Sequence, residues 1–244
     1  MAKARFYHPH PLTLGTTATL SDNASAHATK ALRLQIGDSL SLFNGDGFDY
    51  QCVLSSVKKT AATAQVMLKT AVSKESPLHI TLLQGISSGP RMDYTIQKAT
   101  ELGVTCIQPL ATERSVVKLS MDRAEKRLAH WQNIVHSACE QCGRASIPPV
   151  LAPLSLSHWL ANNSETNSTR ILLNPVGATR LAALAKPEQA IALLIGAEGG
   201  LTEAEIQLAS QHGFLSTVLG PRILRTETAA LTAITVMQSL WGDF

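Results

Sequence analysis

The pattern of hydrophobic and polar positions changes near residue 77. Before it, short runs that alternate apolar and polar residues are separated by Gly, Asp and Asn turns, as in half-buried strands. These runs cover residues 18–20, 39–43, 50–54 and 62–68, and one short helix is predicted over 25–34. After the polar segment 73–77, buried strands and helices alternate, which is typical of a mostly parallel sheet covered by helices. The chain therefore predicts a small β-barrel domain over residues 1–72 and an α/β domain over residues 77–244.

Within the second part, short apolar runs predict strands and longer periodic runs predict helices. The strands are expected over residues 78–84, 104–110, 170–173, 192–195 and 217–219. The helices are expected from Pro90 to Gly103, over 121–141, from Thr202 to Gly213 and over 229–240. Thr202 and Glu205 have the spacing of a capping box, and Gly213 is suited to end that helix.

Three of these strands run into loops rich in main-chain groups. Residues 170–173 lead to Asn174-Pro175, residues 192–195 lead to the segment GAEGG, and residues 217–219 lead to Gly220-Pro221. The carboxyl ends of parallel strands lie at one edge of a sheet, where α/β proteins bind ligands. Three loops at that edge could surround one flat ligand.

The glycine-rich loop does not have the pattern of a phosphate-binding loop. GAEGG lacks the spacing of a dinucleotide fingerprint and has no P-loop lysine. Glu198 in this loop and Glu227 in the last loop would repel a phosphate. A neutral or cationic ligand held by main-chain groups fits better.

The last loop also carries a cluster of polar side chains before an apolar helix. Arg222 and Arg225 precede Thr226, which is a reasonable N-cap, and Glu227 lies in the first helical turn, where the helix dipole favours a carboxylate. The alternative interpretation is a strand-to-helix connection with surface arginines.

The segments IGAEGGLTEAEI and VLGPRILRTETAALTAI resemble the knotted (SPOUT) RNA methyltransferases, specifically the RsmE-type enzymes that methylate N3 of a uridine in 16S ribosomal RNA. Residues 43–47, 97–104 and 131–144 resemble the same family, so the likeness covers essentially the whole chain. Two residues depart from it: Ala197 stands where the family usually has proline, and Leu201 where it often has phenylalanine.

This resemblance implies a trefoil knot in the α/β domain, a PUA-like RNA-binding barrel, and S-adenosylmethionine as the cofactor. The three loops would bind it through Leu173, Asn174, Pro175, Ile195, Gly196, Ala197, Glu198, Gly199, Gly200, Leu219, Gly220, Ile223, Leu224, Arg225, Thr226, Thr228 and Ala229. It also implies a homodimer, and the apolar character of helix 228–240, extended by Trp241 and Phe244, supports that expectation.

Methylation of uridine N3 requires loss of the imide proton, after which negative charge spreads over the two flanking carbonyl oxygens. Arg222 and Arg225 are the candidates to stabilise that anion. Glu227 is the nearest candidate base, although its simpler role is that of a first-turn acid. Water could take the proton instead, so the base stays open.

The positive charge of the chain lies in its first third. Residues 1–75 hold eight Lys and Arg against five Asp and Glu, whereas the rest holds thirteen of each. A basic module beside a neutral body suggests an RNA-docking module, although a surplus this small also arises by chance. The resemblance implies that this RNA is 16S rRNA of the small ribosomal subunit. The candidate RNA contacts are Arg5, Lys30, Arg33, Arg91, Arg114 and Arg144, each of which is alternatively a solvated charge.

Several classes of protein are disfavoured. No apolar run is long enough for a membrane span, and the N-terminus lacks the apolar core of a signal peptide, so a cytoplasmic protein is expected. Cys139 and Cys142 form a lone CxxC in a helical pattern, and no metal site is expected. Two alternatives to the proposed enzyme remain: an RNA-binding protein that acts on another RNA, or one with a regulatory cofactor site. A conventional Rossmann methyltransferase would have its glycine-rich loop first rather than last.

Overall fold

The computed structural model describes residues 4–58, 61–115, 121–164, 167–177 and 179–244. The chain divides into two compact units. The first contains residues 1–75 together with 136–147, and the second contains residues 76–135 and 148–244. Sequence reasoning placed a boundary between residues 72 and 77 but did not anticipate that 136–147 would join the first unit.

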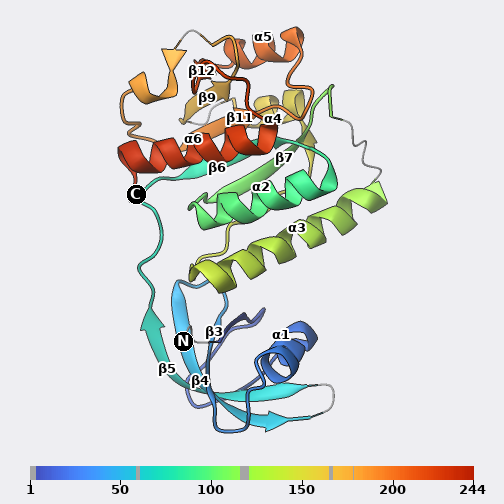
Figure 1. The fold of residues 1–244 in the computed structure, drawn as a ribbon, viewed down its shortest axis with the longest axis vertical. Coiled ribbons are helices and arrows are strands. Elements are labelled where there is room, and N and C mark those ends of the chain that lie inside the picture. Colours follow the sequence, from blue (N-terminus) through green and yellow to red (C-terminus); the bar gives the residue numbers. More distant parts are fainter. Residues whose placement is uncertain (1–3, 59–60, 116–120, 165–166, 178) are drawn as a thin grey trace. The chain divides into compact units, whose positions relative to one another are not determined.

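The first unit is built on a curled five-stranded sheet (Figure 1). Its strands are β1 (Arg5–Tyr7), β2 (Thr17–Thr19), β3 (Ser39–Phe43), β4 (Phe48–Val57) and β5 (Ala62–Ala71), in the order β1-β3-β4-β5-β2. Only the β1–β3 pairing is parallel. Alternate residues of the strands, such as Leu40, Leu42, Cys52 and Leu54, fill one core.

The helix predicted over residues 25–34 takes a different form. The chain forms α1 (Asp22–Ala26) and then the π-helix η1 (His27–Ala31). Ser21 caps α1 by accepting a hydrogen bond from the backbone of Ala24. The segment therefore begins three residues earlier than predicted, because Ser21 is the N-cap that the apolar pattern did not reveal.

The second unit contains a seven-stranded parallel sheet in the order β10-β12-β9-β11-β6-β7-β8, which confirms the predicted α/β class. Its strands are β6 (Ile80–Gly85), β7 (Cys106–Ala111), β8 (Leu154–Ser155), β9 (Thr169–Leu173), β10 (Thr179–Arg180), β11 (Ile191–Ile195) and β12 (Leu215–Val218). β11 is buried at every position, as expected for a central strand with both faces covered.

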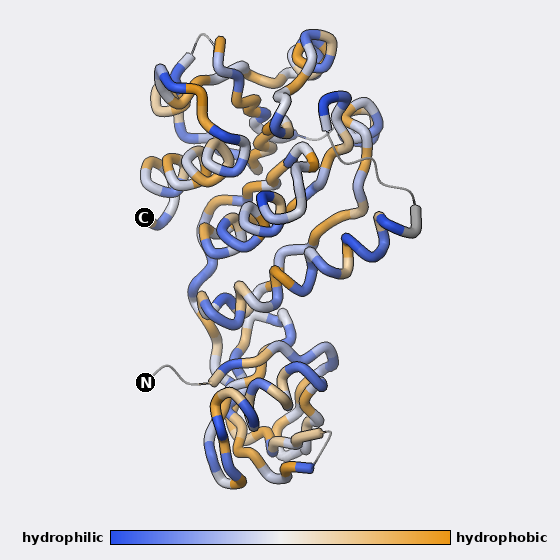
Figure 2. The backbone as a smooth tube through the Cα atoms, turned by 45° about the vertical axis from the view of Figure 1, so that its right-hand side comes forward, coloured by the Kyte–Doolittle hydropathy of each residue, from blue (hydrophilic) through white to orange (hydrophobic). Residues whose placement is uncertain are grey.

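Helices cover both faces of this sheet. They are α2 (Gly89–Glu101), α4 (Leu156–Asn162), α5 (Glu203–Gln211) and α6 (Thr226–Trp241). The 3₁₀ helix η2 (Leu181–Ala183) belongs to the same unit, and α3 (Met121–Cys142) begins in the second unit and ends in the first. Figure 1 shows α2 and α6 on one face. On the other, α4 and α5 pack Trp159 and Ala209 against Leu172 and Leu194. The colour of α3 alternates along its length in Figure 2, as expected for an amphipathic helix.

Candidate functional site

The predicted loops lie together at the carboxyl edge of the parallel sheet. β9, β11 and β12 are neighbours in the sheet, so the segments that follow them meet there. They surround a cavity of about 640 Å³, a size suited to a small organic ligand. Except for Thr228, all the residues expected to bind the cofactor line this cavity, and so do Arg91, Arg114 and Arg222. Thr228 and Glu227 are not among the lining residues.

The glycine-rich loop is a tight turn held by its own backbone. Gly200 donates a hydrogen bond to the carbonyl of Ala197 at 2.9 Å, and its φ of +70° favours glycine. A Cβ on Gly196 would lie 2.7 Å from the backbone carbonyl carbon of Gly200. The sequence folds this way because glycine at both positions allows the chain to double back on itself.

The end of strand β6 packs directly against this turn, a feature that sequence reasoning missed. A Cβ on Gly85 would overlap the backbone nitrogen of Ala197, so only glycine permits this close approach. Next to it, the side chain of Gln84 is fully buried and donates to Thr226 at 2.8 Å. The polar, glycine-containing end of strand β6 is the signal that could have revealed it.

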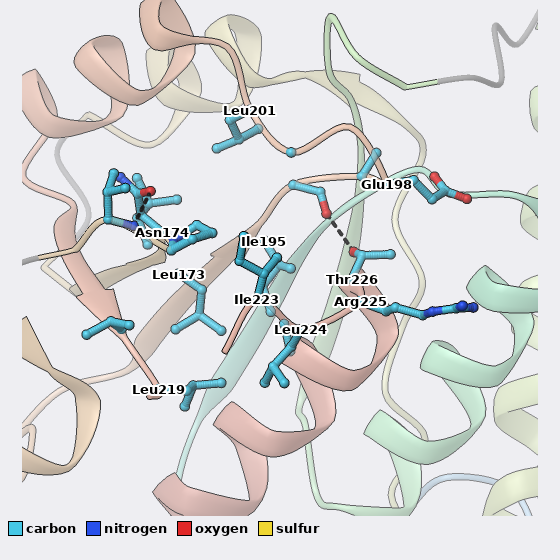
Figure 3. Close-up of a pocket in the computed structure, with 18 of the residues that line it drawn as sticks. Leu173, Asn174, Ile195, Glu198, Leu201, Leu219, Ile223, Leu224, Arg225 and Thr226 are labelled. Carbon is cyan, nitrogen blue, oxygen red and sulfur yellow. Dashed lines mark hydrogen bonds between the residues drawn. The ribbon is translucent and has the colours of Figure 1, made fainter. Parts of the chain in front are cut away.

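Thr226 does not cap helix α6, contrary to the sequence-based prediction. The helix begins at Thr226 with Arg225 at the N-cap position, and Arg225 makes no side-chain capping bond. The buried Thr226 hydroxyl instead donates to the carbonyl of Gly196 at 2.6 Å (Figure 3). It therefore fastens the glycine-rich loop to the start of α6. Glu227 does lie in the first turn, as predicted.

The carboxylates of Glu198 and Glu227 and the guanidinium of Arg91 connect the site to α2. Glu198 accepts hydrogen bonds from the backbone N–H of Ser88 at 2.8 Å and from Arg91 at 3.3 Å. Arg91 also lies 3.9 Å from a carboxylate oxygen of Glu227. Burial alone would raise the pKa of Glu198, but the Ser88 hydrogen bonds and the charge of Arg91 outweigh it and lower that pKa.

Apolar and charged side chains occupy different parts of the site. Figure 3 shows Leu173, Ile195, Leu219 and Leu224 gathered together, whereas Arg225 points away from them. Arg225 and Arg222 are both exposed, and within the described residues neither forms an ion pair with a carboxylate. The lining can thus hold an apolar, neutral or cationic ligand while Arg225 stays available to a second molecule.

Of the remaining arginine candidates, Arg114 belongs to the same site. Its guanidinium donates to the carbonyl oxygens of Gly199 at 3.0 Å and Leu201 at 3.2 Å. It therefore braces the glycine-rich loop. A Cβ on Gly199 would lie 2.9 Å from the Cβ of Arg114, so the two segments are in close contact.

Two other candidates lie inside the first unit. Arg5 pairs with Asp49 at 2.7 Å and donates to the carbonyl of Cys139 at 2.6 Å. Arg144 is buried and pairs with Glu75 at 2.6 Å. Both guanidinium groups therefore hold segments of the unit together. The side chains of Lys30 and Arg33 are exposed.

The four cysteines are free, and no group of three His, Cys, Asp or Glu side chains in the described ranges could hold a metal ion. Within the same ranges, no helix is both long and apolar enough to cross a membrane.

Two family models match the chain, one to each side of residue 70. Residues 74–238 match a family model described as RNA methyltransferase domain, and residues 20–67 match one described as RNA methyltransferase PUA domain. The chain is 37% identical over 240 residues, 98% of its length and 94% of the relative, to ribosomal RNA small subunit methyltransferase E of Buchnera aphidicola. It is 31% identical to the Bacillus subtilis protein of the same name, over 91% of this chain and 89% of that protein.

The chain also resembles solved structures of methyltransferases. A ribosomal RNA small subunit methyltransferase E from Neisseria gonorrhoeae, bound to S-adenosyl methionine, aligns with a TM-score of 0.91 at 45% identity over 99% of both chains. A methyltransferase from Legionella pneumophila in complex with the same cofactor aligns with a TM-score of 0.93 at 41% identity over both full chains.

Proposed function

Because the chain belongs to the RNA methyltransferase family, we propose that it transfers a methyl group from S-adenosylmethionine to N3 of a uridine in 16S ribosomal RNA. The observation that carries the proposal is the arrangement of the site: three main-chain loops and a group of apolar side chains line one cavity, and the side chain of Arg225, at its border, points away from that apolar group. Relatives that carry the name of a small-subunit rRNA methyltransferase, and structures with this cofactor bound, support it.

The residues of the cavity fit S-adenosylmethionine. Its apolar lining and main-chain groups suit an adenosyl group, and Glu198 beside the cavity is compatible with a cationic sulfonium. When bound, the cofactor supplies an electrophilic methyl group. Leu173, Ile195 and Leu224 would exclude water from the cofactor, and the glycine-rich loop from Gly196 to Gly200 would present main-chain groups to it.

Arg225 and Arg222 would act on the uridine. Loss of the N3 proton leaves negative charge on the flanking carbonyl oxygens, and a guanidinium is a permanently charged, planar donor suited to them. Glu227 is held near Arg91 and has a buried carboxylate oxygen with no hydrogen-bond partner in the described structure. We assign it as the candidate base for the N3 proton, with water as the alternative.

The experiment is a transfer assay with radiolabelled S-adenosylmethionine and 16S rRNA from a strain that lacks the modification, followed by mapping of the modified base. Label at N3 of one uridine supports the proposal. Label at another position or on another RNA refutes the assignment of the uridine, and cofactor binding without transfer to any RNA favours a regulatory cofactor site.

We further propose that the second unit forms a trefoil knot and that the enzyme is a cytoplasmic homodimer. Helix α6 carries exposed Leu240, and Phe244 beyond it is 62% exposed, which supports an interface on this side. Trp241 does not extend that exposed surface as the sequence predicted, since it is 7% exposed and packs inside the unit. A monomer by light scattering at micromolar concentration, with methylation intact, would contradict the dimer.

A further inference from the structure

The curled sheet of the first unit has an open seam. Among the described residues, β1 pairs with β3 alone and β2 pairs with β5 alone, so these two strands are the edges of the sheet. A cavity of about 420 Å³ lies between the segment 8–12, which follows β1, and residues 16–21, which include β2. We call it the seam cavity. It lies within one unit and is separate from the cofactor cavity.

One wall of the seam cavity presents main-chain groups. At the two ends of β2, the backbone of Thr16 accepts from Val66 and the backbone of Leu20 donates to Ala62 in β5. Because bonding residues alternate along an antiparallel strand, the N–H and C=O groups of Thr17 and Thr19 face away from β5, toward the open edge. Both side chains are exposed as well. This wall therefore offers donors and acceptors that no strand of the described sheet uses.

The other wall carries two imidazole rings. His8 is only 6% exposed and meets His10 edge-on, with ring centroids 5.7 Å apart. The Nδ1 atom of His8 is buried without a hydrogen-bond partner in the described structure. Burial, and then the neighbouring His10, lower the pKa of His8, so its ring is uncharged at neutral pH. Pro9 and Pro11 complete the wall with flat apolar surface.

We infer that the seam cavity binds one unpaired nucleobase of the substrate RNA. A flat ring can stack against the His10 and proline surfaces while its polar edge pairs with the main chain of Thr17 and Thr19, as single-stranded bases are recognised in RNA-binding modules. An uncharged polar cavity suits a base better than a phosphate. An added peptide strand is disfavoured because β2 offers an edge of only three residues. The inference rests on the proposed RNA substrate.

The test uses the full chain and an unmethylated 16S rRNA fragment. Thr19→Trp should fill the seam cavity from an exposed position, and His10→Ala should remove an exposed ring on which the base stacks. Loss of one base contact weakens binding by roughly tenfold, so we expect the RNA Kd and KM to rise about that much for either variant. The kcat and the Kd for S-adenosylmethionine, measured by calorimetry, should stay at the wild-type values.

The matched control is Thr70→Trp, at an exposed position of β5 in the same sheet that does not line the seam cavity. It should bind RNA as the wild type does. RNA fragments substituted with 4-thiouridine should crosslink to residues 8–21 in the wild type and lose that crosslink in Thr19→Trp. Wild-type RNA affinity in both Thr19→Trp and His10→Ala overturns the nucleobase subsite. A wild type that methylates no 16S rRNA instead contradicts the proposed function.

Discussion

Replacing Thr226 with valine should separate the glycine-rich loop from helix α6. Valine has nearly the same shape and the same χ1 restriction as threonine, but it has no hydroxyl. The change removes the 2.6 Å hydrogen bond to the carbonyl of Gly196 and the 2.8 Å hydrogen bond from Gln84. Gln84 keeps a bond to the carbonyl of Gly85 at 3.1 Å, whereas the Gly196 carbonyl loses this partner.

A buried polar group that loses its partner, as the Gly196 carbonyl does here, destabilises the fold by about 1–3 kcal/mol. The loss at Gln84 is smaller, because this side chain keeps its other hydrogen bond. Together the two losses should lower the free energy of unfolding by about 2–3 kcal/mol. For a unit of this size each kcal/mol lowers the melting temperature by about 2–4 °C, which gives a decrease of about 4–12 °C. Because both fastened segments line the cofactor cavity, the affinity for S-adenosylmethionine should fall as well.

The assay is thermal unfolding followed by circular dichroism, together with calorimetric titration of S-adenosylmethionine. Thr226→Ser is the matched control, because it keeps the hydroxyl and should retain most of both the stability and the affinity. If Thr226→Val melts with the wild type and binds the cofactor equally well, the fastening role of the hydroxyl is refuted.

Three further predictions concern other groups. Arg225→Ala should bind S-adenosylmethionine normally but methylate about 10²–10³-fold more slowly, with partial recovery in Arg225→Lys; an equal loss of cofactor affinity in a binding titration would make the arginine a cofactor ligand. Gly196→Ala should weaken cofactor binding, because its methyl group would strike the backbone of Gly200, and unchanged calorimetric affinity would contradict this. Burial lowers the pKa of His136 to about 4, so the unfolded chain takes up its proton first as pH falls below about 6.5, and stability is lost between these values. His136→Phe, which keeps the stacking on Tyr7, should therefore lose less melting temperature between pH 7 and pH 5 than the wild type; an equal loss would refute this.

Local sequence patterns were sufficient to predict the class of fold and the edge of the sheet at which the proposed cofactor cavity lies. Strand and helix periods are local properties, so β9, β11 and β12 could be predicted from apolar runs, and the capping box of Thr202 and Glu205 formed as expected. Once a parallel sheet is predicted, the loops after its strands must lie at one edge. That reasoning needs no knowledge of which side chains touch.

The roles of individual polar groups could not be predicted in this way, because they depend on contacts between residues far apart in the sequence. Thr226 has the local features of an N-cap, yet its hydroxyl bonds to Gly196, 30 residues away, and Gln84 reaches it from 142 residues away. Likewise, Arg5 and Arg144 have the sequence character of surface cations but pair with Asp49 and Glu75 inside the first unit. Hydrogen bonds and ion pairs act over a few ångströms, and which distant residues come that close depends on packing and strand register, which local sequence patterns do not encode.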